Sequence, residues 1–297
     1  GGTLMRGVVQ RVHAFWSAPE AAGNLAIARI LVALHSLWIL LSRDYAAMAD
    51  VPGIFWRHAS EASRLRYLIV PGAGDIDALL QGIAAMALIA AIVGVAPRVA
   101  CFLAGVLLYH LAPYETLIWQ AAPDARGLTL APIALLVLAA SPSGDAFSLW
   151  PRRKRRSPAE LSAHYGWALR LVQMQVVAIY FFSAIGKVQR TGLDWGSAER
   201  MQLWLLWFNQ DAESVVFGSL GPWMAQFAWL CGAIGVATVL FEWLSPLAIT
   251  WRRSRTLFVV LALCFHVGTL LTMNIHVPET WLIVLLLDWS WSWRSPA

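Results

Sequence analysis

Long runs of apolar residues recur along the chain and are separated by shorter polar stretches. An α-helix needs about 20 consecutive apolar residues to cross the hydrocarbon core of a bilayer, so runs near this length predict membrane-spanning helices. The pattern therefore predicts an all-α, polytopic helical bundle in a membrane, with about eight transmembrane helices. These helices are expected at residues 23–42, 76–96, 99–120, 127–141, 164–188, 222–250, 256–273 and 279–293.

The composition favours a membrane protein over a soluble protein with a large core. Hydrophobic residues make up 59% of the chain and charged residues 13%, whereas about a quarter of the residues in an average soluble domain are charged. We expect residues 1–297 to form one transmembrane domain, in which residues 1–22 are a cytoplasmic segment. The sequence has no mixed aromatic and basic motif that would indicate nucleic-acid binding, and no Cys or His spacing typical of a metal site.

The basic residues are concentrated in particular loops, and this indicates an orientation in the membrane. With a cytoplasmic N-terminus, the two densest basic clusters, 152–156 and 252–255, both lie on the cytoplasmic side, as the positive-inside rule predicts. Both ends of the chain are then cytoplasmic. Two outer segments, 43–75 and 189–221, are too long for simple turns, and the second is expected to lie in the membrane interface or to dip toward a cavity as a lid.

One of the two lysines, Lys187, lies alone at the end of an apolar run. Burial disfavours the charged form of an amine, and lysine, unlike arginine, can then serve as a base. Arg170, Gln173, Tyr180 and Lys187 are separated by whole helical turns, which predicts a polar face that points into the bundle or a wet cavity. The spacing leaves two interpretations of Lys187 open: a base at a site, or a structural lysine that extends to the outer headgroups.

Other ionisable residues lie within predicted spans, where a charge is costly and a functional role is the default expectation. Arg29 could pair with Glu242 as a buried structural ion pair; the alternative is that one of the two tunes a site. His266 could be a hydrogen-bonded core residue or a proton carrier. His110 could act in a relay with Glu115 or pack against it as a polar pair.

Several short segments are similar, in their order along the chain, to one known family. They are residues 25–30, residues 141–150, residues 180–187 followed by Asp194-Trp195-Gly196, and Phe241-Glu242 followed by Phe265-His266. On these segments the chain resembles the horizontally transferred transmembrane (HTTM) domain family. This is the membrane domain that vitamin K-dependent gamma-carboxylases share with bacterial relatives.

The resemblance implies an activity. In the carboxylases a lysine acts as a base toward reduced vitamin K. Oxygenation of the quinol then drives proton removal from a glutamate side chain, addition of CO2 and release of the quinone epoxide. By this resemblance Lys187 is the base, a reduced vitamin K or menaquinol-like quinol is the cofactor, O2 and CO2 are co-substrates, and no metal takes part. The site would face the periplasm from a bacterial inner membrane.

The same interpretation assigns roles to residues around Lys187 and to buried polar residues elsewhere. The candidates for binding the quinone are Tyr180, Ser183, Asp194, Trp195, Trp204, Trp207 and His276, and the supporting polar residues are Arg29, His110, Glu242 and His266. Besides membrane lipid and quinol, a periplasmic peptide or protein is an expected partner. Two other functions stay open: a non-catalytic membrane partner in the maturation, export or immunity of a small peptide, and a transporter of a small molecule or lipid.

Overall fold

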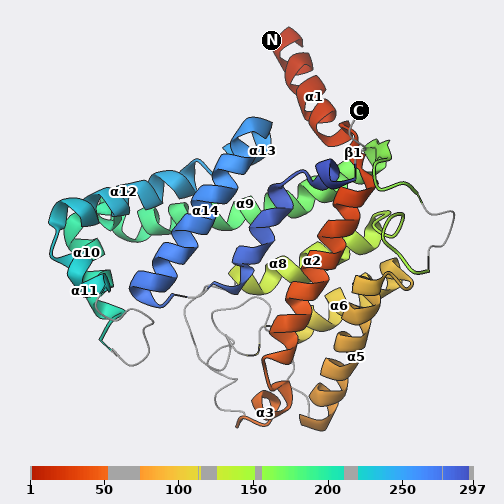
Figure 1. Cartoon of the computed structure of the whole chain (residues 1–297), viewed down its shortest axis with the longest axis horizontal. Coiled ribbons are helices and arrows are strands. Elements are labelled where there is room, and N and C mark those ends of the chain that lie inside the picture. Colours follow the sequence, from red (N-terminus) through yellow and green to blue (C-terminus); the bar gives the residue numbers. More distant parts are fainter. Residues whose placement is uncertain are drawn as a thin grey trace. The chain divides into compact units, whose positions relative to one another are not determined.

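The computed structural model shows an all-α membrane protein (Figure 1). It describes residues 2–52, 74–112, 114, 126–150, 156–210, 220–275 and 277–293. Within these residues the only strands are β1 (Glu20–Ala21) and β2 (Leu161–Ser162), which form one short antiparallel pair. The predicted all-α helical architecture is therefore confirmed.

Four helices of the described chain are long and apolar enough to cross a membrane. They are α2 (Ala22–Leu41), α5 (Gly74–Val93), α14 (Arg252–Met273) and α9 (Ala163–Thr191), which is continued by a 3-10 turn to Gly196. Three further apolar helices are shorter: α6 (Pro97–Leu111), α8 (Arg126–Ala140) and α12 (Ala228–Trp243). Membrane embedding is thus supported by length and composition, and each of these helices overlaps one predicted span.

The predicted count of eight spans is not confirmed. In place of an α-helix at 279–293, the chain forms two 3-10 helices, η4 (Pro278–Leu286) and η5 (Trp289–Ser292). The break between them has a local cause, because the Asp288 side chain accepts a hydrogen bond from the Ser290 backbone N–H and so caps η5. Asp288 thus begins the second 3-10 helix, and the first ends just before it.

The chain divides into two compact units: Gly1–Val172 with Asp288–Ala297, and Gln173–Leu287. In the first unit α2, α5, α6 and α8 pack against one another (Figure 1). A Cβ added to Gly105 of α6 would lie 3.0 Å from Leu136 Cγ and 3.2 Å from the Pro132 carbonyl oxygen. Glycine at this position therefore lets α6 approach α8 closely, as small residues do where membrane helices pack.

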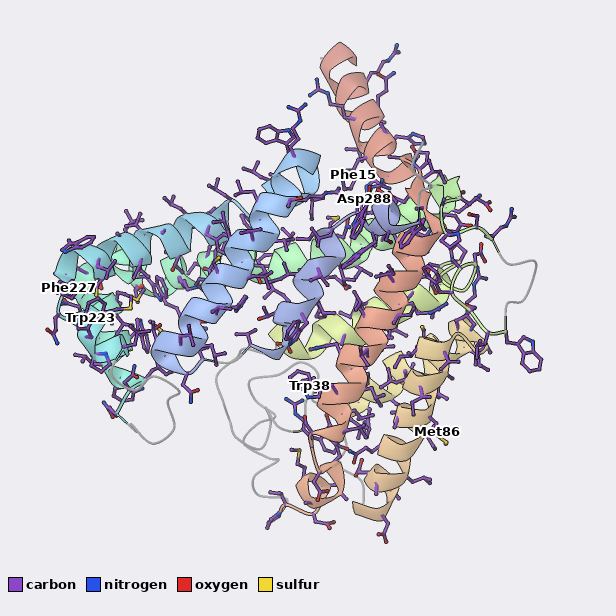
Figure 2. All side chains as sticks on the ribbon, viewed as in Figure 1. Phe15, Trp38, Met86, Trp223, Phe227 and Asp288 are labelled. Carbon is purple, nitrogen blue, oxygen red and sulfur yellow. The ribbon has the colours of Figure 1, made fainter. Side chains whose placement is uncertain are left out.

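The outward faces of the helices in the first unit are apolar. Trp38 of α2 and Met86 of α5, both labelled in Figure 2, have exposed side chains, as do Phe102 and Val106 of α6. The core between these helices is also apolar, so the helices lack the polar outer face of a soluble bundle. A helix that is hydrophobic all round is expected where the surrounding solvent is lipid.

Arg29 of α2 holds the loop that follows α8 through hydrogen bonds from its guanidinium group. Its side chain is fully buried. One guanidinium nitrogen donates to the Ser143 carbonyl at 2.6 Å and to Ser148 Oγ at 2.9 Å, and the other donates to the Phe147 carbonyl at 2.6 Å. Arg29 therefore neutralises carbonyl dipoles of residues 143–148 in its own unit, whereas the sequence-based interpretation was an ion pair with Glu242, which belongs to the second unit.

The same loop is held from its other side by the turn between α5 and α6. Gly94 has φ +80, and a Cβ there would lie 2.5 Å from Ser148 Cα, so only glycine fits. The Leu149 and Trp150 backbone N–H groups donate to the carbonyls of Val93 and Gly94. The loop after α8 is thus an ordered part of the first unit.

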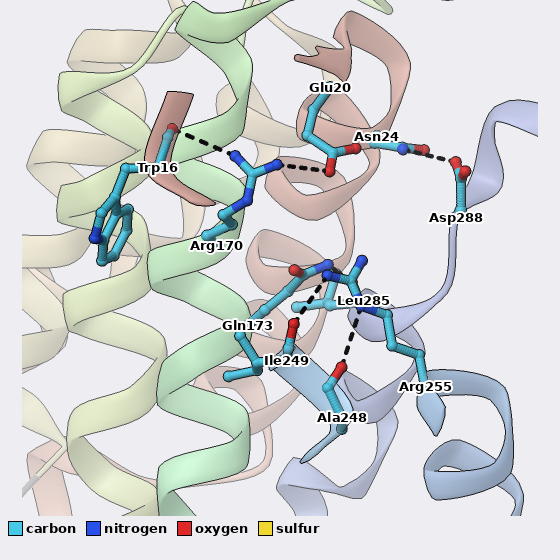
Figure 3. Close-up of polar contacts among 10 residues, drawn as sticks. All are labelled: Trp16, Glu20, Asn24, Arg170, Gln173, Ala248, Ile249, Arg255, Leu285 and Asp288. Atoms are coloured by element: carbon cyan, nitrogen blue, oxygen red, sulfur yellow. Dashed lines mark hydrogen bonds and ion pairs between the residues drawn. The ribbon is translucent and has the colours of Figure 1, made fainter. Parts of the chain in front are cut away.

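The beginning of α9 is attached to the first unit by polar contacts (Figure 3). Arg170 donates to Glu20 at 3.1 Å and to the Trp16 carbonyl at 3.4 Å. Its side chain and that of Glu20 are 5% and 12% exposed, so the pair is largely buried. Next to β1, the Asn24 amide donates to Asp288 at 2.9 Å. Arg170 is therefore a structural cation rather than part of the site around Lys187.

The second unit begins with the remainder of α9. Gln173, Val177 and Tyr180 on its predicted polar face are buried, and Gln173 donates to the Leu285 carbonyl of η4 at 2.8 Å (Figure 3). The expectation that this face points into the protein is confirmed. The unit also contains η2 (Gly192–Gly196), α10 (Ala198–Trp207), α11 (Leu220–Ala225) and α13 (Leu247–Thr250).

One predicted helix, 222–250, is wrong, because α11, α12 and α13 replace it. Proline lacks a backbone N–H and its ring crowds the preceding turn, so α12 ends before Pro246 and α13 begins after it. At the first break, Gln202 of α10 donates to the freed Ala225 carbonyl at 2.7 Å. A neighbouring side chain thus satisfies the backbone where the helix is interrupted.

The outer segment 189–221 is mostly helical where it is described, and α10 packs on the rest of its unit. Met201 and Leu205 of α10 are buried in a cluster with Ala225, Cys231 and Met273. The other face of α10 exposes apolar side chains to the surroundings. Residues 211–219, and most of the segment 43–75, lie outside the described residues.

Candidate functional site

Lys187 of α9 forms an ion pair with Glu242 in the last turn of α12. The lysine Nζ donates to Glu242 Oε1 and, at 3.1 Å, to Ser183 Oγ one turn earlier on α9. The two charged side chains are 17% and 4% exposed. Lys187 is thus held among protein side chains of its own unit.

A third element contributes an aromatic ring to the pair. The Lys187 Nζ lies 4.6 Å from the centre of the Trp195 ring, a cation–π distance. Trp195 belongs to η2, which reaches α12 closely: a Cβ on Gly235 of α12 would lie 2.8 Å from the Gly196 carbonyl oxygen. Glycine at 235 therefore allows the contact that brings the tryptophan over the amine.

The end of α12 is docked on α9 by contacts on both sides of Glu242. Ser245 Oγ donates to the Val177 carbonyl at 3.3 Å, and Trp243 packs edge-on against Phe181 with ring centres 5.5 Å apart. A serine that donates to a helical carbonyl adds a bond that requires close approach of the two backbones. The pairing of Glu242 with Lys187 is thus fixed by helix packing and not by the ion pair alone.

A second polar pair lies on the same stretch of α9. The Tyr180 hydroxyl and His266 Nε2 of α14 are 2.8 Å apart. Phe241 and Phe258 pack edge-on against the Tyr180 ring, at centre distances of 5.6 and 5.4 Å, and stack on each other at 4.9 Å. His266 is therefore hydrogen-bonded within an aromatic cluster, and Phe241 connects this cluster in sequence to Glu242.

The other quinone-binding candidates are more dispersed. Asp194 forms an exposed ion pair with Arg200 at 2.8 Å. Trp204 stacks on Phe208, with ring centres 5.7 Å apart, and packs against the buried cluster of α10, while Trp207 is 58% exposed. His276 lies outside the described residues. Among the candidate tryptophans, the Trp195 ring lies over the Lys187 amine.

His110 belongs to a separate cluster in the first unit. The Tyr114 hydroxyl donates to Asp77 Oδ1 at 3.0 Å and lies 2.9 Å from His110 Nε2, which is itself 3.6 Å from Asp77 Oδ1. Asp77 and Tyr114 are fully buried. Glu115, the partner considered for His110, lies outside the described residues. Sequence analysis missed Asp77 and Tyr114, although Tyr114 follows His110 by four residues and so lies on the same helical face.

Replacing Tyr114 with phenylalanine is expected to lower the free energy of unfolding by about 1–3 kcal/mol, because a buried carboxylate loses a donor. The measurement is the midpoint of thermal unfolding in detergent. Tyr109→Phe is the matched control, since Tyr109 is on α6 beside His110 and forms none of the contacts of this cluster described above. Equal midpoints for both variants and the unaltered protein would show that the hydroxyl does not support Asp77.

Within the part of the chain that the structure describes, no group of three or more His, Cys, Asp or Glu side chains could hold a metal ion. Lys187 and Glu242 are themselves groups that can transfer a proton and stabilise charge. The lysine and the carboxylate together are neutral, whether the proton lies on nitrogen or on oxygen. Such a pair can accept one further proton and become a cation.

The chain matches no family model, and the comparisons with curated proteins and with solved structures found no match.

Proposed function

We propose that this membrane protein binds a reduced vitamin K or menaquinol-like quinol and removes a proton from it at the Lys187–Glu242 pair, as the first step of quinol oxygenation to the epoxide. The observation that carries the proposal is a lysine at the end of a long apolar helix, paired with a carboxylate and covered by the ring of Trp195. The resemblance to the HTTM family, with its lysine base, adds to it.

The pair suits this step because one proton is shared between the Lys187 amine and the Glu242 carboxylate. In the reacting form the shared proton of the pair lies on Glu242, so the neutral Lys187 amine takes the proton that a quinol hydroxyl gives up, and the product holds a lysine ammonium beside the neutral Glu242 carboxyl group. The ammonium then faces the newly formed oxygen anion. Opposite charges attract more strongly where water is excluded, so the low exposure of both side chains increases the stabilisation of that anion.

Aromatic side chains near the pair match the shape of a quinol. Trp195 and Phe241 supply flat apolar surface close to Lys187 and next to Glu242. Offset stacking and edge-on contacts of aromatic rings contribute about 0.5–1.5 kcal/mol each beyond burial. The Tyr180–His266 pair is a further group that could exchange a proton with a bound hydroxyl, because its tautomer can change.

The oxygenation that follows consumes O2. We extend the proposal to the step that the resemblance implies, proton removal from a glutamate side chain and addition of CO2, with a periplasmic peptide or protein as substrate. The proposed location is the periplasmic side of a bacterial inner membrane. The clustering of basic residues at 152–156 and 252–255, which places Lys187 on the opposite side, supports it.

Epoxide formation from reduced vitamin K by the purified protein tests the proposal. Lys187→Met is expected to lower the rate by about 10²–10⁴, the contribution of a general base. Lys187→Arg should fail similarly, because arginine keeps the charge but does not release its proton. Arg190→Gln is the control, since Arg190 is exposed one turn further along α9. Undiminished turnover in Lys187→Arg would refute the role of the lysine.

A wild-type protein that neither binds quinol nor forms epoxide would reject the activity altogether. Co-purification of a peptide with such a protein would favour the non-catalytic peptide partner. Binding can be followed separately from turnover by extracting quinones from the purified protein and measuring them by mass spectrometry. Loss of turnover with retained quinol binding in Lys187→Met is the expected combination.

A further inference from the structure

The first unit contains a half-open recess of about 340 Å³ at the ends of three helices. It lies at the start of α6, after the end of α8 and at the start of α9. Most of the exposed surface inside it is polar, with Arg98, Asp145, Arg156, Glu160, His164 and Tyr165 among its lining residues. None of these residues belongs to the pair around Lys187, so the recess is separate from the proposed quinol chemistry.

The charges in the recess are arranged in two parts. Arg156 and Glu160 neutralise each other in an ion pair at 3.0 Å. Arg98 and His164, both exposed, remain as cationic or hydrogen-donating groups, and Arg98 uses its Nε to donate to the Ser141 carbonyl. Asp145 supplies an anionic group, which accepts from the Tyr165 hydroxyl at 3.0 Å. The recess therefore offers both signs of charge to one ligand.

The start of α9 strengthens the cationic part. His164 lies in its first turn, where Ser162 Oγ accepts from the His164 backbone N–H at 3.2 Å. The helix dipole makes the N-terminus of a long helix favourable for a negative group such as phosphate. Arg98 and His164 add side-chain donors that a phosphate oxygen accepts well.

The surroundings of the recess indicate a ligand with hydrocarbon chains. Along α6, Phe102 and Val106 follow Arg98 at four-residue spacing, and their side chains are 58% and 45% exposed. An arginine at the top of an exposed apolar helix face is placed like one at a membrane boundary. Leu149 and Trp150, in the loop beside the recess, are also exposed, as residues in the interfacial region commonly are.

We propose that this recess binds the headgroup of a zwitterionic phospholipid that carries a primary ammonium group. The phosphate is bound by Arg98, His164 and the start of α9, and the ammonium is bound by Asp145. The acyl chains lie along the apolar face of α6 that contains Phe102 and Val106. A ligand with a phosphate alone would leave Asp145 facing it, whereas the zwitterion matches both parts of the recess.

Native mass spectrometry of the whole protein in detergent tests this. The probes are short-chain phosphatidylethanolamine, phosphatidylcholine and phosphatidylglycerol, and glycerophosphoethanolamine as the headgroup without acyl chains. Phosphatidylethanolamine is expected to bind most tightly, because its ammonium has N–H groups and its phosphate is retained. Glycerophosphoethanolamine should bind at least tenfold more weakly, since it lacks apolar chains.

Variants separate the recess from general lipid binding. Arg98→Gln and His164→Gln should each weaken phosphatidylethanolamine binding about three- to tenfold, the range for loss of one charge-assisted hydrogen bond at a partly exposed site. Asp145→Asn should remove the preference for phosphatidylethanolamine over phosphatidylcholine. Arg253→Gln is the control, because Arg253 is exposed and does not line the recess.

Three results would overturn the proposal. The first is equal binding by the unaltered protein and by His164→Gln, a variant whose exposed side chain is not needed for folding. The second is equal affinity for the three phospholipids. The third is tight binding of glycerophosphoethanolamine, which would assign the recess to a soluble zwitterion. None of these results depends on quinol turnover, so this inference and the proposed function can fail independently.

Discussion

Replacing Glu242 with glutamine is expected to lower the free energy of unfolding by about 3–5 kcal/mol, the range for removing one partner of a buried ion pair. The reason is that Lys187, 17% exposed, would keep its charge without the carboxylate that offsets its removal from water. Ser183 and Trp195 would still contact the amine but carry no negative charge. The midpoint of thermal unfolding in detergent measures the change.

A double variant measures the coupling energy between Lys187 and Glu242 separately from the contribution of each side chain alone. Lys187→Met combined with Glu242→Gln should be less destabilised than the sum of the two single variants, by about 0.5–3 kcal/mol, because the second substitution removes the unpaired charge. The exposed Asp194–Arg200 pair is the control within the same unit. Asp194→Asn should leave the unfolding midpoint nearly unchanged, since water and salt already screen that pair. Strict additivity of the two core substitutions would contradict a coupled pair.

Replacing Arg29 with methionine is expected to lower the free energy of unfolding by about 3 kcal/mol or more. Methionine fills much of the volume but leaves the buried Ser143 carbonyl and the partly buried Phe147 carbonyl without their donor. These acceptors are backbone groups, so no second substitution can remove them. Buried ion pairs can sometimes be replaced by apolar groups at little cost, but that requires removing both partners.

Arg29→Lys should be intermediate, because one ammonium keeps the charge but cannot donate in the two directions of the guanidinium fork. Limited proteolysis of residues 141–150 is the second measurement, since this loop is what Arg29 holds. Arg11→Gln, an exposed arginine of α1 (Gly2–Ser17), is the control. Protection of the loop in Arg29→Met equal to that in the unaltered protein would show that the turn at Gly94 is sufficient to hold it.

The sequence predicted the limits of several helices closely, because polar residues next to the apolar run mark where each helix ends. The helix expected at 127–141 is found at Arg126–Ala140, and the one at 23–42 is found at Ala22–Leu41. In both cases the apolar run ends at polar residues. The expected helix at 222–250 failed because its residues stay apolar across two breaks. Hydrophobicity reports burial or lipid contact, and it does not report which backbone groups are satisfied by neighbours.

The candidate site was predictable in part. Lys187 was identified from its isolation in an apolar run, and the buried face of α9 from helical spacing. Arg29 and Glu242 were each recognised as buried polar groups, but their observed partners, the loop at 143–148 and Lys187, were not predicted. Asp77 was missed because one aspartate near the start of an apolar run has the same sequence appearance as an exposed residue at the membrane boundary. Its burial became evident from its contact with Tyr114.

By itself, the sequence determined that this is an all-α membrane protein, where most of its apolar helices lie and which face of α9 is buried. These properties depend on composition and on a period of 3.6 residues, so neighbouring residues are enough to specify them. Only the tertiary structure decided that Glu242 pairs with Lys187, that Arg29 holds a loop, and that Trp195 covers the amine. A charge in a low-dielectric interior takes whichever partner the helix packing brings within hydrogen-bond distance, and that distance depends on residues far apart in the chain.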